Sequence, residues 1–155
     1  MTDMPIYMHF LYSTLATVGF SIFLNAPVKT LLPAGVTGGL GWAMFYYLIG
    51  VSSNSIFANF VAAAVVSCMS EILARKLKQP AILFVIPGII PLVPGLGMYN
   101  TMLYLVQGNY DLAISTGADV LFVACAIALG VLVITSLART ISLILLRKNA
   151  IRWFV

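Results

Sequence analysis

The residues of this chain that are best suited to chemistry lie in the stretch FVIPGIIPLVPGLGMY, residues 84–99. Pro87, Pro91 and Pro94 lack an amide N–H, and in a continuous helix each ring would clash with the carbonyl four residues earlier. An interior proline costs a helix about 3 kcal/mol relative to alanine, so this group of prolines predicts a break. The carbonyls of Leu83, Pro87 and Ile90 would then lose their usual helical donors.

The residues after this break could bind an anion through their backbone. Pro94 suits the first turn of a new helix, where its missing N–H costs nothing. The amides of Gly95, Leu96 and Gly97 would then point into the gap, where the positive end of the helix dipole favours a carboxylate. Tyr99 lies one turn further on and adds a hydroxyl or a ring face. Broken helices of transporters hold substrate carboxylates in this way.

Such a break can exist inside a membrane only where protein or a water-filled cavity borders the unpaired backbone. We therefore expect the segment to face inward. The apolar arms on either side are similar in length, so the break is expected near the middle of the bilayer. A simple kink is the plainer alternative, because Pro and Gly are common in membrane helices.

Two pairs of polar residues lie near the ends of other apolar runs. Glu71 and Arg75 are four residues apart and share a helix face. They form either an interfacial ion pair or a substrate or proton group at an inner mouth. Asn25 and Lys29 flank Pro27 in the corner after the first apolar run, where Lys29 either attracts anions or only fixes the orientation of the chain.

Three further features have both a structural and a functional interpretation. His9, the only histidine, is either an interfacial residue or a proton relay. Gly35 and Gly39 form a G-x-x-x-G pattern, which lets helices approach closely. Asn59 and Ser67 are eight residues apart and share a helix face, so they either line a cavity or bond across helices.

No catalytic, metal-binding or cofactor-binding pattern appears in the sequence. With one histidine and no acid beside it, a Ser/His/Asp set cannot be built, and there is no H-E-x-x-H, P-loop or dinucleotide fingerprint. Cys68 and Cys125 lie in apolar runs without metal-ligand spacing, and we expect them to be small buried residues. We therefore expect no enzyme activity, no cofactor and no metal site.

The composition indicates that the bilayer is the solvent of this chain. Of its 155 residues, 62% are hydrophobic and only 8% are charged, whereas a soluble domain carries about 25% charged residues. We expect one all-α transmembrane domain over residues 1–155, whose first apolar run is retained as a span and not cleaved as a signal peptide. About five transmembrane helices are expected, and the fourth is broken at the Pro/Gly motif. The expected spans are 6–24, 34–51, 56–74, 81–106 and 118–146.

The basic residues predict the orientation, because cytoplasmic loops collect Lys and Arg. Five spans place every basic loop and the basic tail on one side, so the N-terminus is expected outside and the C-terminus inside. The net charge of +4 then indicates contact with anionic lipid headgroups and not with nucleic acid. The basic residues on the inner side are Lys29, Arg75, Lys76, Lys78, Arg147, Lys148 and Arg152, and the acidic residues on the outer side are Asp3, Asp111 and Asp119.

Three runs of the sequence resemble the threonine/serine exporter family. They are VGFSIFLNAPVK (18–29), SEILARKLKQPA (70–81) and IPGIIPLVPGLGMYNTM (86–102). The P-L-V-P-G…Y part of the third run is the most specific. The similarity covers nearly the whole chain and is greatest to the short, single-domain form, the small subunit of split two-component exporters.

This resemblance implies a subunit of a secondary exporter in the bacterial inner membrane. Its substrates would be small organic acids or amino acids, namely threonine and serine or succinate, and protons would drive their export. Its partner would be a larger subunit that supplies five further spans. Together with the backbone argument, the resemblance gives these candidate substrate-binding residues: Asn25, Lys29, Glu71, Arg75, Pro91, Pro94, Gly95, Leu96, Gly97 and Tyr99.

Two other functions fit the same sequence. A non-transporting scaffold or assembly subunit would use the broken helix only to pack against another chain. A homo-oligomeric carrier would transport its substrate without a larger partner.

Overall fold

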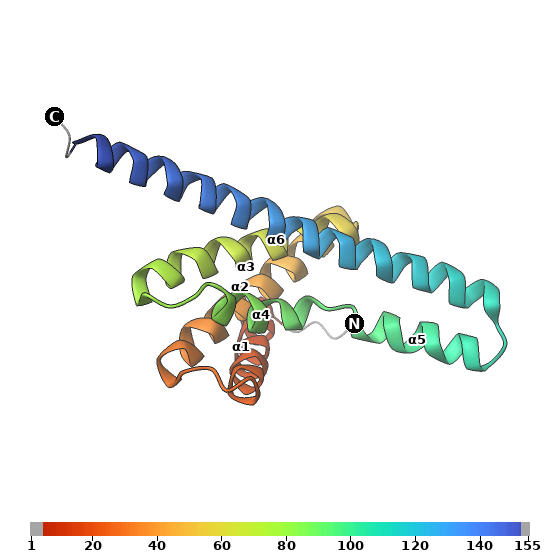
Figure 1. The fold of residues 1–155 in the computed structure, drawn as a ribbon. Helices are drawn as coiled ribbons and strands as arrows, with labels where there is room; N and C mark the ends of the chain where they lie inside the picture. The colour runs from red at the N-terminus through yellow and green to blue at the C-terminus, as the bar shows by residue number, and fades with distance from the viewer. Residues whose placement is uncertain (1–4, 153–155) are drawn as a thin grey trace.

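The structure of the chain is a computed structural model that describes the backbone of residues 5–152 and the side chains of residues 5–142 and 144. These residues form helices and no strand, which confirms the predicted all-α class (Figure 1). Four helices are long and apolar enough to cross a membrane, and a bent pair would make a fifth span. The elements are α1 (Ile6–Phe23), α2 (Val28–Ser52), α3 (Ser55–Leu77), α4 (Ile82–Ile89), the 3₁₀ helix η1 (Ile90–Leu92), α5 (Gly95–Val106) and α6 (Tyr110–Arg152).

Helix α2 begins earlier than the apolar window predicted. It starts at Val28, so Lys29 and Pro33 lie inside a helix and not in a loop. Pro27 precedes the first turn with φ −55° and ψ 138°, and the Thr30 hydroxyl donates to the Pro27 carbonyl at 2.7 Å. Average hydropathy does not detect such hydrogen bonds, so the predicted start of this helix lies after its polar first turn.

Helix α6 also begins earlier than expected, at Tyr110 and not near residue 118. The side chain of Asn109 accepts a hydrogen bond from the amide of Leu112 at 3.4 Å, which is the usual way to stabilise a helix N-terminus. The predicted loop is therefore too long, and Asp119 lies inside the helix.

Helices α1 and α2 pack through small residues. Gly38 and Gly39 of α2 lie against Thr17 and Thr14 of α1, and a Cβ at either glycine would overlap the facing threonine. Gly35 is equally close, because its Cβ would lie 2.5 Å from a methyl group of α1. The glycine pattern therefore has the predicted packing role. The adjoining core, between α2, α3, η1 and α6, contains Ala62, Ala63, Val66, Leu92, Val123 and Ile127.

The fourth span is broken, as predicted, but the break does not begin at the first proline. Helix α4 continues through Pro87, and η1 contains Pro91. The chain becomes extended only at Val93, with φ −60° and ψ 128°. The segments before and after this point differ in direction by 53°.

The carbonyl groups of Pro87 and Ile90 lose their usual helical donors, as predicted, because Pro91 and Pro94 have no N–H, but these carbonyl groups are not left unpaired. The Ile90 amide donates to the Pro87 carbonyl, and the Val93 amide donates to the Ile90 carbonyl at 3.2 Å. Both bonds join residues three apart, as in a 3₁₀ helix. The tighter winding therefore replaces the donors that the prolines lack.

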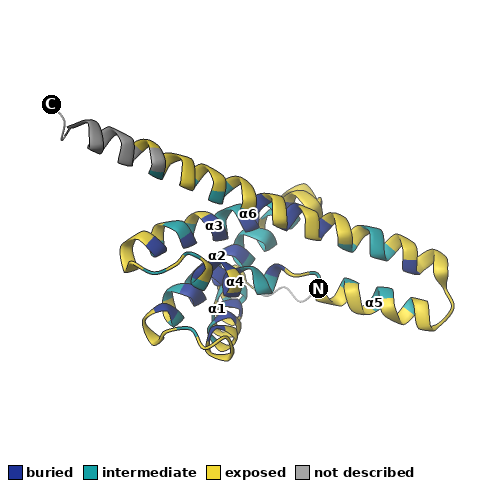
Figure 2. Cartoon of the chain, in the orientation of Figure 1, coloured by how far each residue is buried: buried dark blue, intermediate teal, exposed yellow. Residues whose placement is uncertain are grey.

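Helix α5 and the first half of α6 form a hairpin that projects from the bundle of α1–α4 (Figure 1). Helix α5 packs mainly against α6 and contains no buried residue, in contrast to α3 (Figure 2). Helix α6 contains 43 residues, a length of about 65 Å at about 1.5 Å per residue. Beyond the hairpin it crosses α3 at Gly130, where a Cβ would lie 2.5 Å from the carbonyl oxygen of Phe60.

Cys68 and Cys125 are both exposed, so their predicted burial is wrong. The error arises because a membrane helix is apolar on its lipid-facing side as well as on its packed side, and an apolar run does not distinguish the two. Among the described residues, no group of His, Cys, Asp or Glu could hold a metal ion.

Candidate functional site

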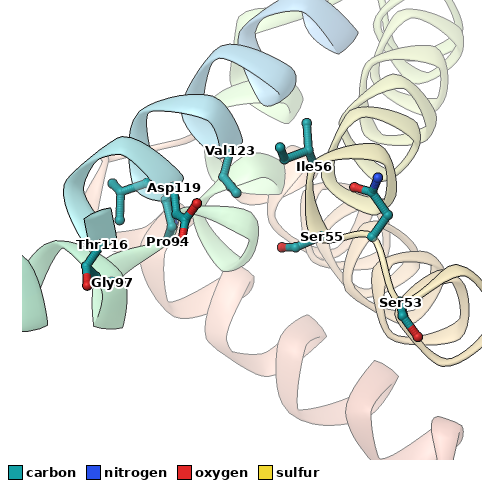
Figure 3. Close-up of a pocket in the computed structure, with 10 residues that line it drawn as sticks. Ser53, Ser55, Ile56, Pro94, Gly97, Thr116, Asp119 and Val123 are labelled. Atoms are coloured by element: carbon teal, nitrogen blue, oxygen red, sulfur yellow. The ribbon is translucent and has the colours of Figure 1, made fainter. Parts of the chain in front are cut away.

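Two adjoining clefts border the break between η1 and α5. The larger has a volume of about 520 Å³ and lies between the end of α2, the start of α3, the start of α5 and the first half of α6 (Figure 3). The smaller, of about 230 Å³, runs along the break itself. Since both contain Ser55, Pro94, Gly97 and Val123, they form one site, which we call the break cleft.

Five of the predicted site residues line the break cleft. They are Pro91, Pro94, Gly95, Leu96 and Gly97. The extended conformation at Val93 puts them there, because it ends one helical segment and starts the next within three residues.

The first turn of α5 has no side-chain cap. Pro94 precedes the helix and makes no side-chain hydrogen bond to it. The Gly95 amide donates to the Val93 carbonyl at 2.7 Å, so it is less free than predicted. The amides of Leu96 and Gly97 belong to the first turn, which has no intrahelical acceptors. They are the backbone donors that a ligand could use.

The two glycines of this turn differ in their surroundings. A Cβ at Gly95 would meet no atom within 4 Å, whereas a Cβ at Gly97 would lie 2.6 Å from a methyl group of Val120. Gly97 therefore brings α5 against α6. Nothing within the described chain requires a glycine at position 95.

Polar groups line the cleft on the α3 side. Asn59 is buried and donates through its amide nitrogen to the Ser55 carbonyl at 2.8 Å and to the Ser55 hydroxyl at 3.3 Å. It therefore lines a cavity, as one interpretation predicted, and does not bond across helices. The hydroxyl of Ser67, two turns further along α3, is buried without a hydrogen-bond partner.

The carboxylate of Asp119 also lines the cleft, and the sequence analysis did not select it. Asp119 and Thr116 come from α6 and lie on the cleft wall opposite Ser55 (Figure 3). The prediction counted Asp119 among the acidic residues of the outer side, although the expected span of 118–146 contained it. One signal in the sequence could have identified Asp119 as a site residue. It directly precedes the apolar run VLFVACAIALG (120–130), with no turn residue between them.

The remaining predicted residues lie elsewhere. Tyr99 is 63% exposed on α5 and does not line the cleft. Asn25, in the left-handed region at φ 54°, and Lys29 lie where α2 begins. Glu71 and Arg75 lie where α3 ends. The cleft is at the opposite ends of these helices, where α2 ends and α3 begins.

Arg75 joins α3 to α6. Its guanidinium donates to the Ala138 carbonyl and to the Ser142 hydroxyl, both at 3.0 Å. Glu71 and Arg75 do not form an ion pair in the described structure, although their spacing allows one. Arg75 therefore bonds to α6 and not to Glu71 of its own helix.

His9 lies beside the break, because it lines a cleft together with Pro91. The Trp42 indole donates to His9 Nδ1 at 3.4 Å, and the His9 ring stacks on Tyr46 with centroids 3.9 Å apart. His9, Ser13, Trp42 and Pro91 border a separate cleft of about 280 Å³. His9 Nε2 is buried without a partner.

The apolar helices, with a bent pair beside a cleft that contains polar groups, define a multi-pass membrane protein. Residues 9–137 match the family described as Threonine/Serine exporter, ThrE, and the chain belongs to that family. The resemblance found in the sequence is thereby confirmed.

Curated relatives include a "Threonine/serine exporter" of Corynebacterium glutamicum, 31% identical over 77% of this chain and 24% of its own length. An "Uncharacterized protein" of Haemophilus influenzae is 28% identical over 63% of this chain and 33% of its own length. A "Probable threonine/serine exporter" of Mycobacterium tuberculosis is 24% identical over 64% of this chain and 19% of its own length. The chain thus spans a third or less of each relative. No solved structure matches it.

Proposed function

We propose that this chain is one subunit of a secondary exporter of small carboxylate-bearing metabolites, threonine and serine or succinate, in the bacterial inner membrane. The names of two relatives support export of threonine and serine. The relatives are three or more times longer than the matched region, which supports a larger subunit as the partner that supplies the remaining spans.

The observation that carries this proposal is the break in the fourth span. The substrate carboxylate binds to the uncapped first turn of α5, where the amides of Leu96 and Gly97 lack intrahelical acceptors. The positive end of the helix dipole favours the negative charge. Leu92 of η1 packs near Gly41, in the middle of α2, which supports a break near the midplane, and the cleft extends from the break toward the end of the bundle where α2 ends. Alternating access, driven by protons, then releases it.

The orientation with the N-terminus outside is part of the proposal. The starts of α2 and α4 and the end of α3 meet around Ala34, Ala74 and Phe84, and the basic residues of this part of the chain lie at that end. An inner side rich in Lys and Arg fits the positive-inside rule. The break cleft, at the other end, then opens outward.

The test is reconstitution of the chain in liposomes with and without the candidate larger subunit, followed by counterflow of threonine, serine and succinate. In the active assembly, Gly95→Leu should lower counterflow at least about tenfold, equal to roughly 1.4 kcal/mol of binding, because its Cβ would meet no atom of the fold and the rest of the side chain would occupy space in the cleft. Gly19→Leu is the matched control, since Gly19 also faces open space but lies on α1 away from the cleft. Normal counterflow with Gly95→Leu would contradict the proposal.

A scaffold or assembly subunit is the alternative function, and the exposure of α5 favours it. A helix without a buried residue could serve only to contact another chain. In that case Gly95→Leu would reduce assembly with the partner and leave flux per assembled complex unchanged. Transport by the chain reconstituted alone would instead indicate a homo-oligomeric carrier.

A further inference from the structure

We propose that Asp119 binds the ammonium group of the exported solute, so that the break cleft takes a zwitterionic α-amino acid in preference to a dicarboxylate. This inference rests on the proposed function and narrows its substrate class. It assigns a specificity-determining role to a residue that the Pro/Gly motif does not include.

The first argument is the position of the carboxylate. Asp119 is exposed on α6, directly before the apolar run of residues 120–130, and it lines the cleft together with Pro94 and Gly97. No basic side chain lines the cleft, and the described lysines and arginines lie away from it. The cleft therefore presents a carboxylate that no basic side chain of the described residues neutralises.

The second argument is the proximity of Asp119 to the uncapped turn of α5. A Cβ at Gly97 would lie 2.6 Å from Val120, the residue that follows Asp119, so the two groups border the same side of the cleft (Figure 3). One end of the cleft thus favours a carboxylate and the adjacent side favours a cation. An α-amino acid carries both charges on one carbon and matches this pair.

The third argument concerns the ligands that this arrangement disfavours. A dicarboxylate would place its second negative charge against Asp119, and like charges at close range are repelled. The hydroxyls of Ser55 and Thr116 on the cleft walls offer hydrogen bonds to a hydroxylated side chain. The chemistry of the lining therefore fits threonine or serine better than succinate.

The test compares threonine with 3-hydroxybutyrate, which is threonine without its ammonium group. Binding of labelled threonine to the detergent-purified assembly is measured by scintillation proximity, with each unlabelled solute as competitor, and counterflow is measured in parallel. We expect the wild type to prefer threonine at least about tenfold, and Asp119→Asn to lose that preference, as is typical when one partner of a charge pair is removed. Asp119→Glu should retain part of it.

Asp111→Asn is the matched control, because Asp111 lies two turns earlier on α6, is exposed and does not line the cleft. Helical content and elution volume show whether each variant is folded. An unchanged threonine preference in Asp119→Asn overturns the inference, and so does a variant that keeps the preference but loses only proton-driven accumulation.

The same measurements separate this inference from the proposed function. Asp119-dependent threonine binding without counterflow contradicts export and supports the assignment of Asp119. Counterflow with an unchanged preference in Asp119→Asn supports export and contradicts the assignment. Absence of threonine binding by the wild type contradicts the assignment of Asp119, whereas absence of counterflow with threonine, serine and succinate contradicts the proposed function.

Discussion

The bundle of α1–α4 and the hairpin of α5 and α6 are built differently. In the bundle, glycine, alanine and threonine side chains bring helices into close contact, and Ala58, Ala62 and Ala63 are fully buried. In the hairpin, α5 buries no residue, and Leu96 and Val106 are 75% and 87% exposed. Both regions are apolar in sequence, so hydropathy alone does not distinguish them.

This difference indicates where stability and where function reside. Close contact between small residues supplies packing that lipid tails cannot replace, so the bundle holds itself together. Helix α5 of the hairpin depends mainly on its contact with α6 and on whatever surrounds it. Substitutions in the bundle should therefore reduce folding, whereas substitutions in the hairpin should change the cleft and assembly more than the fold.

The largest effect is expected for Gly38→Leu, which tests the bundle. Any side chain at this position overlaps Thr17, and overpacking of a tight contact costs about 1–3 kcal/mol or more. We expect little folded protein after purification, measured by thermal unfolding and elution volume. Gly19 lies on an open face of α1, so the yield and thermal stability of Gly19→Leu should stay close to those of the wild type. Equal stability of the two variants would show that packed and open glycines do not differ.

A smaller effect is expected for Gly97→Val, which tests the hairpin. The new side chain would push against Val120 and separate α5 from α6 at a cost of about 1–3 kcal/mol. Because Thr101 of α5 lies close to Gly117 of α6, a Thr101→Cys/Gly117→Cys pair reports the contact by disulfide formation. Crosslinking should be efficient in the parent and weak with Gly97→Val, while thermal unfolding of the bundle changes little. Loss of the entire fold would show that the two regions are not independent.

The smallest effect, and of opposite sign, is expected for Ser67→Ala. The Ser67 hydroxyl is buried inside the bundle and has no partner, and a buried unsatisfied group costs about 1–3 kcal/mol. Alanine removes the hydroxyl and leaves a small space, so stability should stay the same or rise by up to about 1 kcal/mol. Ser70→Ala is the control, because its hydroxyl donates to the Val66 carbonyl at 2.7 Å. A loss of stability with Ser67→Ala that exceeds the loss with Ser70→Ala would mean that Ser67 has a partner.

The class of fold, the broken span and the glycine contacts could be predicted from the sequence, because composition and proline chemistry act locally. The exact start of the break could not. The start of the break depends on which carbonyl groups near Pro87 accept hydrogen bonds from other amides. The amides of Ile90 and Val93 donate to them only because η1 is a 3₁₀ helix.

The candidate site was predicted in part for a similar reason. The Pro/Gly motif predicted one wall of the cleft, because the backbone properties of proline and glycine act on consecutive residues. The adjacent wall comes from α6, and Asp119 reaches the cleft because α5 packs against α6 at Gly97 and Val120. The local spacing of Glu71 and Arg75 suggested a pair, but Arg75 bonds to α6, a contact that sequence spacing does not reveal.

The length of α6 has a consequence for how the molecule sits in lipid. The apolar part, Tyr110–Ser142, contains 33 residues, or about 50 Å at about 1.5 Å per residue, against a hydrocarbon thickness of about 30 Å. To fit entirely, this rod would have to incline by about 50°, beyond the 0–40° of ordinary spans. The alternative is that its first turns, which carry the acidic residues Asp111 and Asp119, emerge from the acyl chains. Hydrophobic mismatch would then set the cleft mouth at the boundary with water.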